Sequence, residues 1–161
     1  MMNTKQLLAS PLWIIPLPLL IGMFLGQMGK LDPWYQTLRK PFLQPPKIVF
    51  PIAWTILYLL IGASYYRVLI KAKLSSYAHP LIYAMVGHLL INYSYTPAFF
   101  RYKQILLSAI ICLATLITAV YLYWTFQKYD TSGWASWLLV PYLGWLTFAN
   151  YLAWSIVWLN R

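Results

Sequence analysis

Five long stretches of this sequence contain no Asp, Glu, Lys or Arg, and together they make up most of the chain. They lie between Lys5 and Lys30, Lys47 and Arg67, Lys73 and Arg101, Lys103 and Lys128, and Asp130 and Arg161. An α-helix needs about 20 apolar residues to cross the roughly 30 Å of hydrocarbon in a bilayer. Each stretch is close to or above that length, so the sequence predicts five membrane-spanning helices.

The low charge content argues against two other architectures. Charged residues make up 9% of the chain, whereas a soluble domain usually contains about 25%. A soluble helical bundle needs a polar face on its surface helices, and uncharged stretches of this length leave none. A transmembrane β-barrel would alternate apolar and polar residues, but these stretches are continuously apolar. The predicted fold class is therefore all-α, a bundle of five transmembrane helices.

The helices fit into a single membrane domain over residues 1–161. We expect them at about 10–29, 48–70, 79–101, 104–127 and 133–159. Residues 30–47 join the first two and cannot form a continuous helix, because four prolines interrupt them. These prolines are Pro33, Pro41, Pro45 and Pro46. The short turn at Arg101 and Lys103 predicts that the third and fourth helices are antiparallel neighbours.

The net charge of +10, from 12 basic and 2 acidic residues, favours contact with a membrane surface. Nucleic-acid binding is the alternative, but the basic residues are scattered over several short loops and form no stripe. The two acidic residues, Asp32 and Asp130, lie in loops at predicted opposite faces, where they cannot act as an acid–base pair. No Cys/His spacing typical of a metal site occurs, so we expect no metal and no required cofactor.

Aromatic and amide side chains recur at helical spacing in the expected helices. In the third helix, the residues that share one face are His88, Asn92, Tyr95 and Phe99. Comparable faces of the second and fifth helices carry Trp54, Tyr58 and Tyr65, and Trp134, Trp137, Pro141, Trp145 and Ala149. Flat rings with a few polar atoms suit a flat, mostly apolar ligand.

Each of these features also has a structural interpretation. Aromatic residues near helix ends form a belt at the membrane–water interface. The residues in such positions are Trp13, Tyr102, Trp124, Tyr129, Trp134 and Trp158. Asn92 and His88 can form hydrogen bonds between helices or contribute to a ligand site, and His88 can be an axial haem ligand. Gly22 and Gly26 permit close backbone approach, either within the bundle or in a dimer.

A more specific pattern begins at residue 34. The chain reads Trp34-Tyr35-x2-Leu38-x-Lys40-Pro41-x3-Pro45-Pro46, and then Val49-Phe50-Pro51-x2-Trp54-x2-Leu57-Tyr58. The third and fifth helices add Asn92-x3-Thr96-Pro97-x-Phe99-Phe100 and Pro141-Tyr142-Leu143-x-Trp145-x2-Phe148-Ala149. With the spacing of Gly22 and Gly26, these motifs closely resemble those of the translocator protein family (TspO, also called the peripheral-type benzodiazepine receptor). The resemblance covers about residues 12–160.

The resemblance implies an architecture and a ligand site. Family members have five transmembrane helices, are usually dimeric, and hold a ligand pocket inside each monomer, which the 30–47 loop would cover as a lid. They occur in bacterial envelopes and mitochondrial outer membranes. They bind porphyrins, cholesterol, and synthetic ligands such as isoquinoline carboxamides and benzodiazepines. The matching pocket positions are Tyr35, Pro45, Trp54, Tyr58, Asn92, Tyr95, Trp145 and Ala149.

The implied function is that of a homodimeric membrane receptor for tetrapyrroles such as porphyrin or haem, and for sterols or isoquinoline- and benzodiazepine-type ligands. It would act as a sensor, scavenger or transporter, with the lipid bilayer and planar apolar molecules as partners and without nucleic acid. The alternative is a photochemical enzyme that degrades porphyrin, with Trp54 and Trp145 as the catalytic residues.

Three positions depart from the family pattern. Tyr95 stands where the family usually has Trp or Phe, and a phenol is more polar than either. Leu43 occupies the position of a common loop tryptophan. The vertebrate cholesterol motif requires a basic residue within about five residues of a tyrosine, but Tyr151 lies ten residues before Arg161. We therefore do not expect tight cholesterol binding at that motif.

Overall fold

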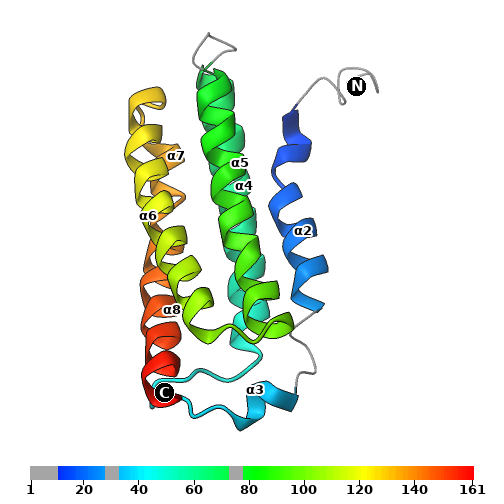
Figure 1. Cartoon of the computed structure of the whole chain (residues 1–161). Coiled ribbons are helices and arrows are strands. Elements are labelled where there is room, and N and C mark those ends of the chain that lie inside the picture. The colour runs from blue at the N-terminus through cyan, green and yellow to red at the C-terminus, as the bar shows by residue number, and fades with distance from the viewer. Residues whose placement is uncertain (1–10, 28–32, 73–77) are drawn as a thin grey trace.

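The computed structural model of the chain describes residues 11–27, 33–72 and 78–161, and all regular structure in these residues is helical. The elements in chain order are η1 (Pro11–Ile14), α2 (Leu17–Gly26), α3 (Pro33–Thr37), α4 (Val49–Ala72), α5 (Ala78–Thr96), η3 (Pro97–Arg101), α6 (Ile105–Tyr129), α7 (Trp134–Trp137) and α8 (Val140–Leu159). Figure 1 shows α2, α4, α5, α6 and α8 running along a common direction, with α3 across one end. The predicted all-α bundle is confirmed.

The outer surface of this bundle is strongly apolar. On α6, Leu106, Ile117 and Tyr121 are 54%, 60% and 60% exposed. A soluble monomer rarely shows such a contiguous apolar surface, whereas lipid chains cover it readily. Within the described residues, α4 over Val49–Ile70 and α6 over Ile105–Tyr129 are long and apolar enough to cross a membrane. The count of five spans stays a prediction, because α2 has 10 residues and only α4 and α6 of the described helices are both long and apolar enough to count as spans.

Prolines make the first helix shorter than expected. The sequence predicted one helix over about 10–29, but the structure has η1, a turn at residues 15–16, and then α2. Residues 28–32 lie outside the described part of the chain. Pro16 has no backbone N–H and cannot continue a helix from η1. A new helix starts instead, with the Leu20 amide donating to Pro16 O at 3.0 Å.

Two further prolines change the third and fifth expected helices. The helix expected over 79–101 is α-helical only to Thr96 and then widens into the π-helical turn η3, in which the Tyr102 amide donates to Pro97 O at 3.0 Å. The helix expected over 133–159 is divided into α7 and α8, because Pro141 cannot donate to the carbonyl four residues earlier. The second and fourth expected helices agree with α4 and α6 to within two residues at each end.

Two glycines allow the N-terminal segment to pack closely on α4. A Cβ atom at Gly62 would lie 2.0 Å from Ile15 O, so only glycine fits where the η1–α2 turn crosses α4. A Cβ atom at Gly22 would lie 2.3 Å from the Tyr58 ring. Gly22 therefore packs within the bundle, whereas a Cβ atom at Gly26 would have no neighbour within 4 Å. Of the two alternatives, packing within the bundle thus applies to Gly22, and a dimer contact at Gly26 stays a prediction.

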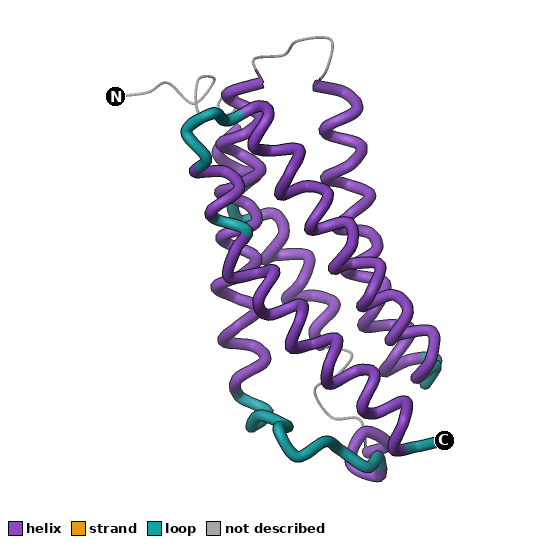
Figure 2. The backbone as a smooth tube through the Cα atoms, turned by 90° about the vertical axis from the view of Figure 1, so that its left-hand side faces the viewer, coloured by secondary structure: helices purple, strands orange, loops and turns teal. Residues whose placement is uncertain are grey.

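The described part of the expected lid, residues 33–47, crosses one end of the bundle next to the C-terminus (Figure 2). Asn160, which follows α8, holds the backbone of the lid by two hydrogen bonds. The Arg39 amide donates to Asn160 Oδ1 at 2.9 Å, and Asn160 Nδ2 donates to Arg39 O at 2.9 Å. These two bonds connect residues that lie 121 positions apart and fix the lid to the end of α8.

Candidate functional site

Aromatic rings from α4 and α8 form a compact cluster inside the bundle. Trp54 and Tyr58, one helical turn apart on α4, stack with centroids 5.0 Å apart and planes at 28°. Tyr142 and Trp145 of α8 meet Trp54 edge-on, at 6.3 and 6.5 Å. Phe50 lies edge-on to Trp145 at 5.9 Å. These stacked and edge-on contacts give the site flat apolar walls.

A chain of polar side chains runs beside this cluster and joins four helices. The Tyr58 hydroxyl donates to Asn92 Oδ1 at 2.8 Å, and Asn92 Nδ2 donates to Tyr142 Oη at 3.1 Å. His88 Nε2 lies 3.0 Å from Tyr142 Oη, and His88 Nδ1 lies 2.7 Å from Thr118 Oγ1 on α6. Both ring nitrogens of His88 therefore have protein partners, which favours the interhelical hydrogen bond over the axial haem ligand.

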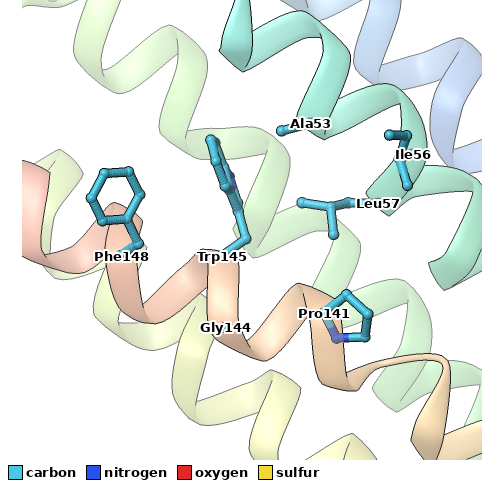
Figure 3. A pocket seen from close by; sticks show the side chains of 7 residues that line it. All are labelled: Ala53, Ile56, Leu57, Pro141, Gly144, Trp145 and Phe148. Carbon is cyan, nitrogen blue, oxygen red and sulfur yellow. The ribbon is translucent and has the colours of Figure 1, made fainter. Parts of the chain in front are cut away.

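An apolar groove of about 320 Å³ opens between α4 and α8 at the edge of the aromatic cluster. Figure 3 shows Trp145 of α8 facing Ala53 and Leu57 of α4 across it, with Phe148 on the other side of Trp145. The Trp145 Nε1 atom is buried and has no hydrogen-bond partner in the described structure. A buried donor without a partner costs free energy, so a ligand acceptor that reached this N–H would be bound favourably.

The lid packs on the bundle mainly through aromatic side chains. Tyr35 contacts Phe99 and Phe100 edge-on, each at 5.9 Å between ring centroids. Gln44 Nε2 donates to the Tyr35 hydroxyl at 3.0 Å, and Lys40 Nζ lies 4.8 Å from the centre of the Tyr35 ring. Burial raises the pKa of Tyr35, partly offset by the bond from Gln44, so its hydroxyl stays protonated at neutral pH. Tyr35 is the centre of the lid contacts.

The structure brings four of the eight expected positions into the aromatic and polar cluster, namely Trp54, Tyr58, Asn92 and Trp145. The others lie on the side of the lid. Tyr95 stacks on Phe99 with centroids 5.7 Å apart and planes at 7°, and Phe99 in turn contacts Tyr35. Tyr95 and Ala149 pack on a small buried cluster of Ala109, Cys112, Ala153 and Val157. Pro45 is half-buried in the lid.

Three residues expected on helix faces with the site residues lie elsewhere. Trp134 and Trp137 are 63% and 64% exposed, because the break before α8 separates α7 from the helix that carries Trp145. The exposure of Trp134 fits the expected interfacial belt, as does that of Trp13, Tyr102, Trp124 and Trp158, whereas Tyr129 is half-buried and packs against the core. Tyr65 is buried, but it packs edge-on against Phe126 of α6, with centroids 5.8 Å apart.

A model of the TspO/MBR family matches residues 14–159, nearly the whole chain. The protein belongs to the TspO/MBR family. A "Tryptophan-rich sensory protein" of Cereibacter sphaeroides is 36% identical over 135 residues, which are 84% of this chain and 82% of the relative. The "Tryptophan-rich protein TspO" of Archaeoglobus fulgidus is 31% identical over 99% of both chains. The "Translocator protein" of Bos taurus is 30% identical over 84% of this chain and 83% of the relative.

Membership in the TspO/MBR family confirms the resemblance seen in the motifs and makes this chain an integral membrane protein, in agreement with its apolar outer surface. The predicted contact with the lipid bilayer follows from the same assignment.

Sequence reasoning did not select several residues that the structure places at the site of this TspO/MBR family member. Tyr142 and Thr118 complete the polar chain, and Gln44 and Asn160 hold the lid. Tyr142 stands in the family motif, directly after Pro141. Thr118 is a hydroxyl in a strongly apolar helix, which is a recognisable signal. Nothing in the sequence alone indicates that Asn160 reaches Arg39.

The end of the TspO/MBR bundle opposite the lid contains a buried carboxylate. It belongs to Asp130, which lies in a loop, as the sequence predicts. Asp130 receives hydrogen bonds from the Ser132 hydroxyl, Arg67 Nε and the Ala135 amide. Burial raises the pKa of Asp130, but these three hydrogen bonds and the Arg67 charge outweigh burial and hold the pKa well below its usual range. The other acidic residue, Asp32, lies outside the described residues.

Proposed function

We propose that this protein is a membrane receptor that binds a flat, largely apolar small molecule of the tetrapyrrole class in the aromatic cluster below the lid. The observation that carries this proposal is the unpartnered Trp145 Nε1–H beside the apolar groove and the Trp54–Tyr58 stack. A binding site of this kind usually combines apolar walls with a few polar atoms that orient the ligand.

The groove limits how such a ligand is held. Its volume of about 320 Å³ is near the lower end of the roughly 300–1,000 Å³ found for ligand sites. A porphyrin is larger than this space, so its binding requires the Trp145 or Phe148 side chain to rotate away from α4. Because α4 and α8 form the two walls, the ligand would reach the site from the bilayer.

The charges of the lid support a ligand with carboxylates at one edge. Arg39 and Lys47 have exposed side chains at the lid end of the bundle. Porphyrin carboxylates cannot be buried without partners, so they would point toward this end and pair with the two basic groups. The apolar macrocycle would then lie deeper, against the rings of Trp54 and Trp145.

The titration of protoporphyrin into the full-length protein in detergent tests this function through the quenching of tryptophan fluorescence. We expect saturable quenching, and Trp145→Phe is expected to weaken binding about tenfold, because it removes the N–H donor and part of the stacking surface. The matched control is Trp124→Phe, which changes a side chain that is 61% exposed on α6. Non-saturable quenching, or equal dissociation constants for the two variants, would contradict the proposal.

Reconstituted liposomes distinguish a receptor from a transporter. A fluorescent porphyrin that binds saturably without accumulating on the trans side indicates a sensor or scavenger. Accumulation that depends on the protein indicates transport. The oligomeric state of the protein is measured in the same liposomes. It shows whether a single chain binds the ligand or whether binding occurs in the homodimer that the family resemblance implies.

Light-driven porphyrin breakdown is the second candidate, and one observation favours it. The Trp54 and Trp145 rings lie 6.5 Å apart, so both indoles would contact a photoexcited ligand in the site. In this case the Trp54→Phe/Trp145→Phe double variant loses product formation under illumination while ligand affinity remains measurable. Unchanged turnover in the double variant would remove this candidate.

A further inference from the structure

The Thr118 hydroxyl on α6 determines which groups donate and which accept along the polar chain. The Thr118 hydroxyl has one proton, and its oxygen lies 2.9 Å from Ala114 O and 3.1 Å from Thr115 O. Carbonyl oxygens can only accept, so these contacts are favourable when Thr118 donates its proton to its own helix. The 2.7 Å contact between Thr118 Oγ1 and His88 Nδ1 then requires a proton on Nδ1.

The remaining directions follow from this first one. Neutral imidazole carries a single ring N–H, so His88 Nε2 accepts a hydrogen bond, and the Tyr142 hydroxyl donates it. Tyr142 Oη in turn accepts from Asn92 Nδ2, and Asn92 Oδ1 accepts from the Tyr58 hydroxyl. The Tyr58 proton is thereby engaged, and the Tyr58 oxygen can only accept a hydrogen bond from a further partner.

We propose that Thr118 and His88 are positioning residues that set the ligand specificity of the site. With His88 held as the Nδ1–H tautomer, Tyr58 meets a ligand as a hydrogen-bond acceptor, whereas Trp145 Nε1 meets it as a donor. The ligand class that fits is therefore a flat apolar molecule with an N–H or O–H group on the side of Tyr58. This inference rests on the proposed function, because it concerns the ligand of the same site.

The same five side chains would also form a continuous chain in the opposite direction. With the proton on Nε2, His88 would donate to Tyr142, Tyr142 to the rotated Asn92 amide oxygen, and the Asn92 amide nitrogen to Tyr58. The Tyr58 proton would then be free for a ligand acceptor. Because the hydroxyl of Thr118 decides between the two directions, Thr118→Val is expected to convert His88 to the Nε2–H tautomer and reverse the chain.

The tautomer can be read without any ligand, by 15N NMR of the full-length protein labelled at histidine in detergent. The chain has two histidines, and the signal lost in His88→Gln belongs to His88. We expect Nδ1–H in the wild type, Nε2–H in Thr118→Val, and Nδ1–H again in Thr118→Ser, which restores the hydroxyl. Thr115→Val is the matched control, since Thr115 donates to Ile111 O within α6. Nε2–H in the wild type, or Nδ1–H in Thr118→Val, would overturn the inference.

Specificity is tested with two flat tricyclic probes of similar size, carbazole with an N–H donor and fluorenone with a carbonyl acceptor. The ratio of the fluorenone to the carbazole dissociation constant should be about threefold to tenfold higher in the wild type than in Thr118→Val. Contacts with Trp145 Nε1 affect both proteins equally and cancel in this comparison. Thr118→Ser should restore the wild-type ratio, and a ratio that is equal in all variants would overturn the specificity.

The two measurements separate this inference from the proposed function. If neither the tricyclic probes nor protoporphyrin bind, the proposed function fails, and with it the specificity that rests on it, while the tautomer of His88 still tests the direction of the chain. If the probes bind but their ratio does not respond to Thr118→Val, the proposed function stands and the inference fails. A Thr118→Val variant that does not fold leaves the wild-type tautomer as the deciding observation.

Discussion

Arg67 Nε donates a hydrogen bond to Asp130 Oδ2 at 2.7 Å and so joins α4 to the turn that follows α6, across 63 positions of the chain. The Asp130 side chain is 1% exposed and the Arg67 side chain 35%. Asp130 also accepts a hydrogen bond from the Ala135 amide. The carbonyl oxygen of Ala135 in turn accepts a hydrogen bond from the Ser64 hydroxyl of α4. These contacts hold α4, α6 and α7 together at the end of the bundle opposite the lid (Figure 1).

Asp130→Asn is expected to lower the free energy of unfolding by about 2 kcal/mol. Loss of one partner of a fully buried ion pair costs about 3–5 kcal/mol, and the partial exposure of Arg67 reduces this. The measurement is the unfolding midpoint in one detergent. Lys128→Gln, which changes an exposed charge two residues earlier on α6, should leave the midpoint unchanged. A midpoint for Asp130→Asn equal to that of the wild type would show that the pair contributes nothing.

The stability should also depend on pH in the acid range. Because the pKa of Asp130 is lower in the folded protein than in the unfolded chain, its contribution is fully present above the unfolded pKa of about 3.9. That contribution is lost as the pH falls through the lower folded value. Unfolding midpoints measured from neutral pH downward should therefore fall more steeply for the wild type than for Asp130→Asn. Parallel curves for the two proteins would contradict the assignment.

Asn160→Ala should loosen the lid at one defined amide. The Arg39 amide donates to Asn160 Oδ1, and its hydrogen exchange is expected to become about threefold to tenfold faster when that acceptor is removed. Asn160→Asp is the matched control, since it keeps an oxygen for the Arg39 amide and loses only the donor to Arg39 O. Equal exchange in the wild type and both variants would show that Asn160 does not hold the lid.

Gly62→Ala tests the crossing of the η1–α2 turn over α4. The added methyl group would meet Ile15 O at 2.0 Å, so we expect destabilisation of about 1–3 kcal/mol as the backbone is displaced. Gly87→Ala on α5 is the control, because its Cβ atom would have no neighbour within 4 Å. If the two variants unfold at the same midpoint, the N-terminal segment does not pack on α4 as the structure describes.

The faces read from helical spacing meet in the structure to a large extent. Trp54 and Tyr58 on α4, Asn92 on α5 and Trp145 on α8 converge, because residues three or four apart share a face wherever the helix lies. The same rule wrongly placed Trp137 on one face with Trp145, because it assumed one continuous helix through residues 133–159. A proline breaks that helix, and the face on the two sides of the break is no longer the same.

The expected helix boundaries failed at three prolines within apolar runs, Pro16, Pro97 and Pro141, but not at Pro51 in the first turn of α4. Membrane helices tolerate proline when neighbouring groups replace the lost hydrogen bond, so the sequence leaves open whether the helix bends, widens or stops. The structure contains a stop at Pro16, a π-helical turn from Pro97 and a break before Pro141. Which of these occurs depends on the packing of the neighbouring helices.

Taken alone, the sequence determined the helical class, the apolar surface, the proline-rich lid and the family, since all of these follow from composition, periodicity and local motifs. Only the tertiary structure decided the pairing of Arg67 with Asp130, of Asn160 with the Arg39 backbone, and of His88 with Thr118. Such pairs depend on how far each helix is rotated about its axis and shifted along its neighbour. An uncharged stretch leaves both quantities open, because lipid accepts any apolar face equally well.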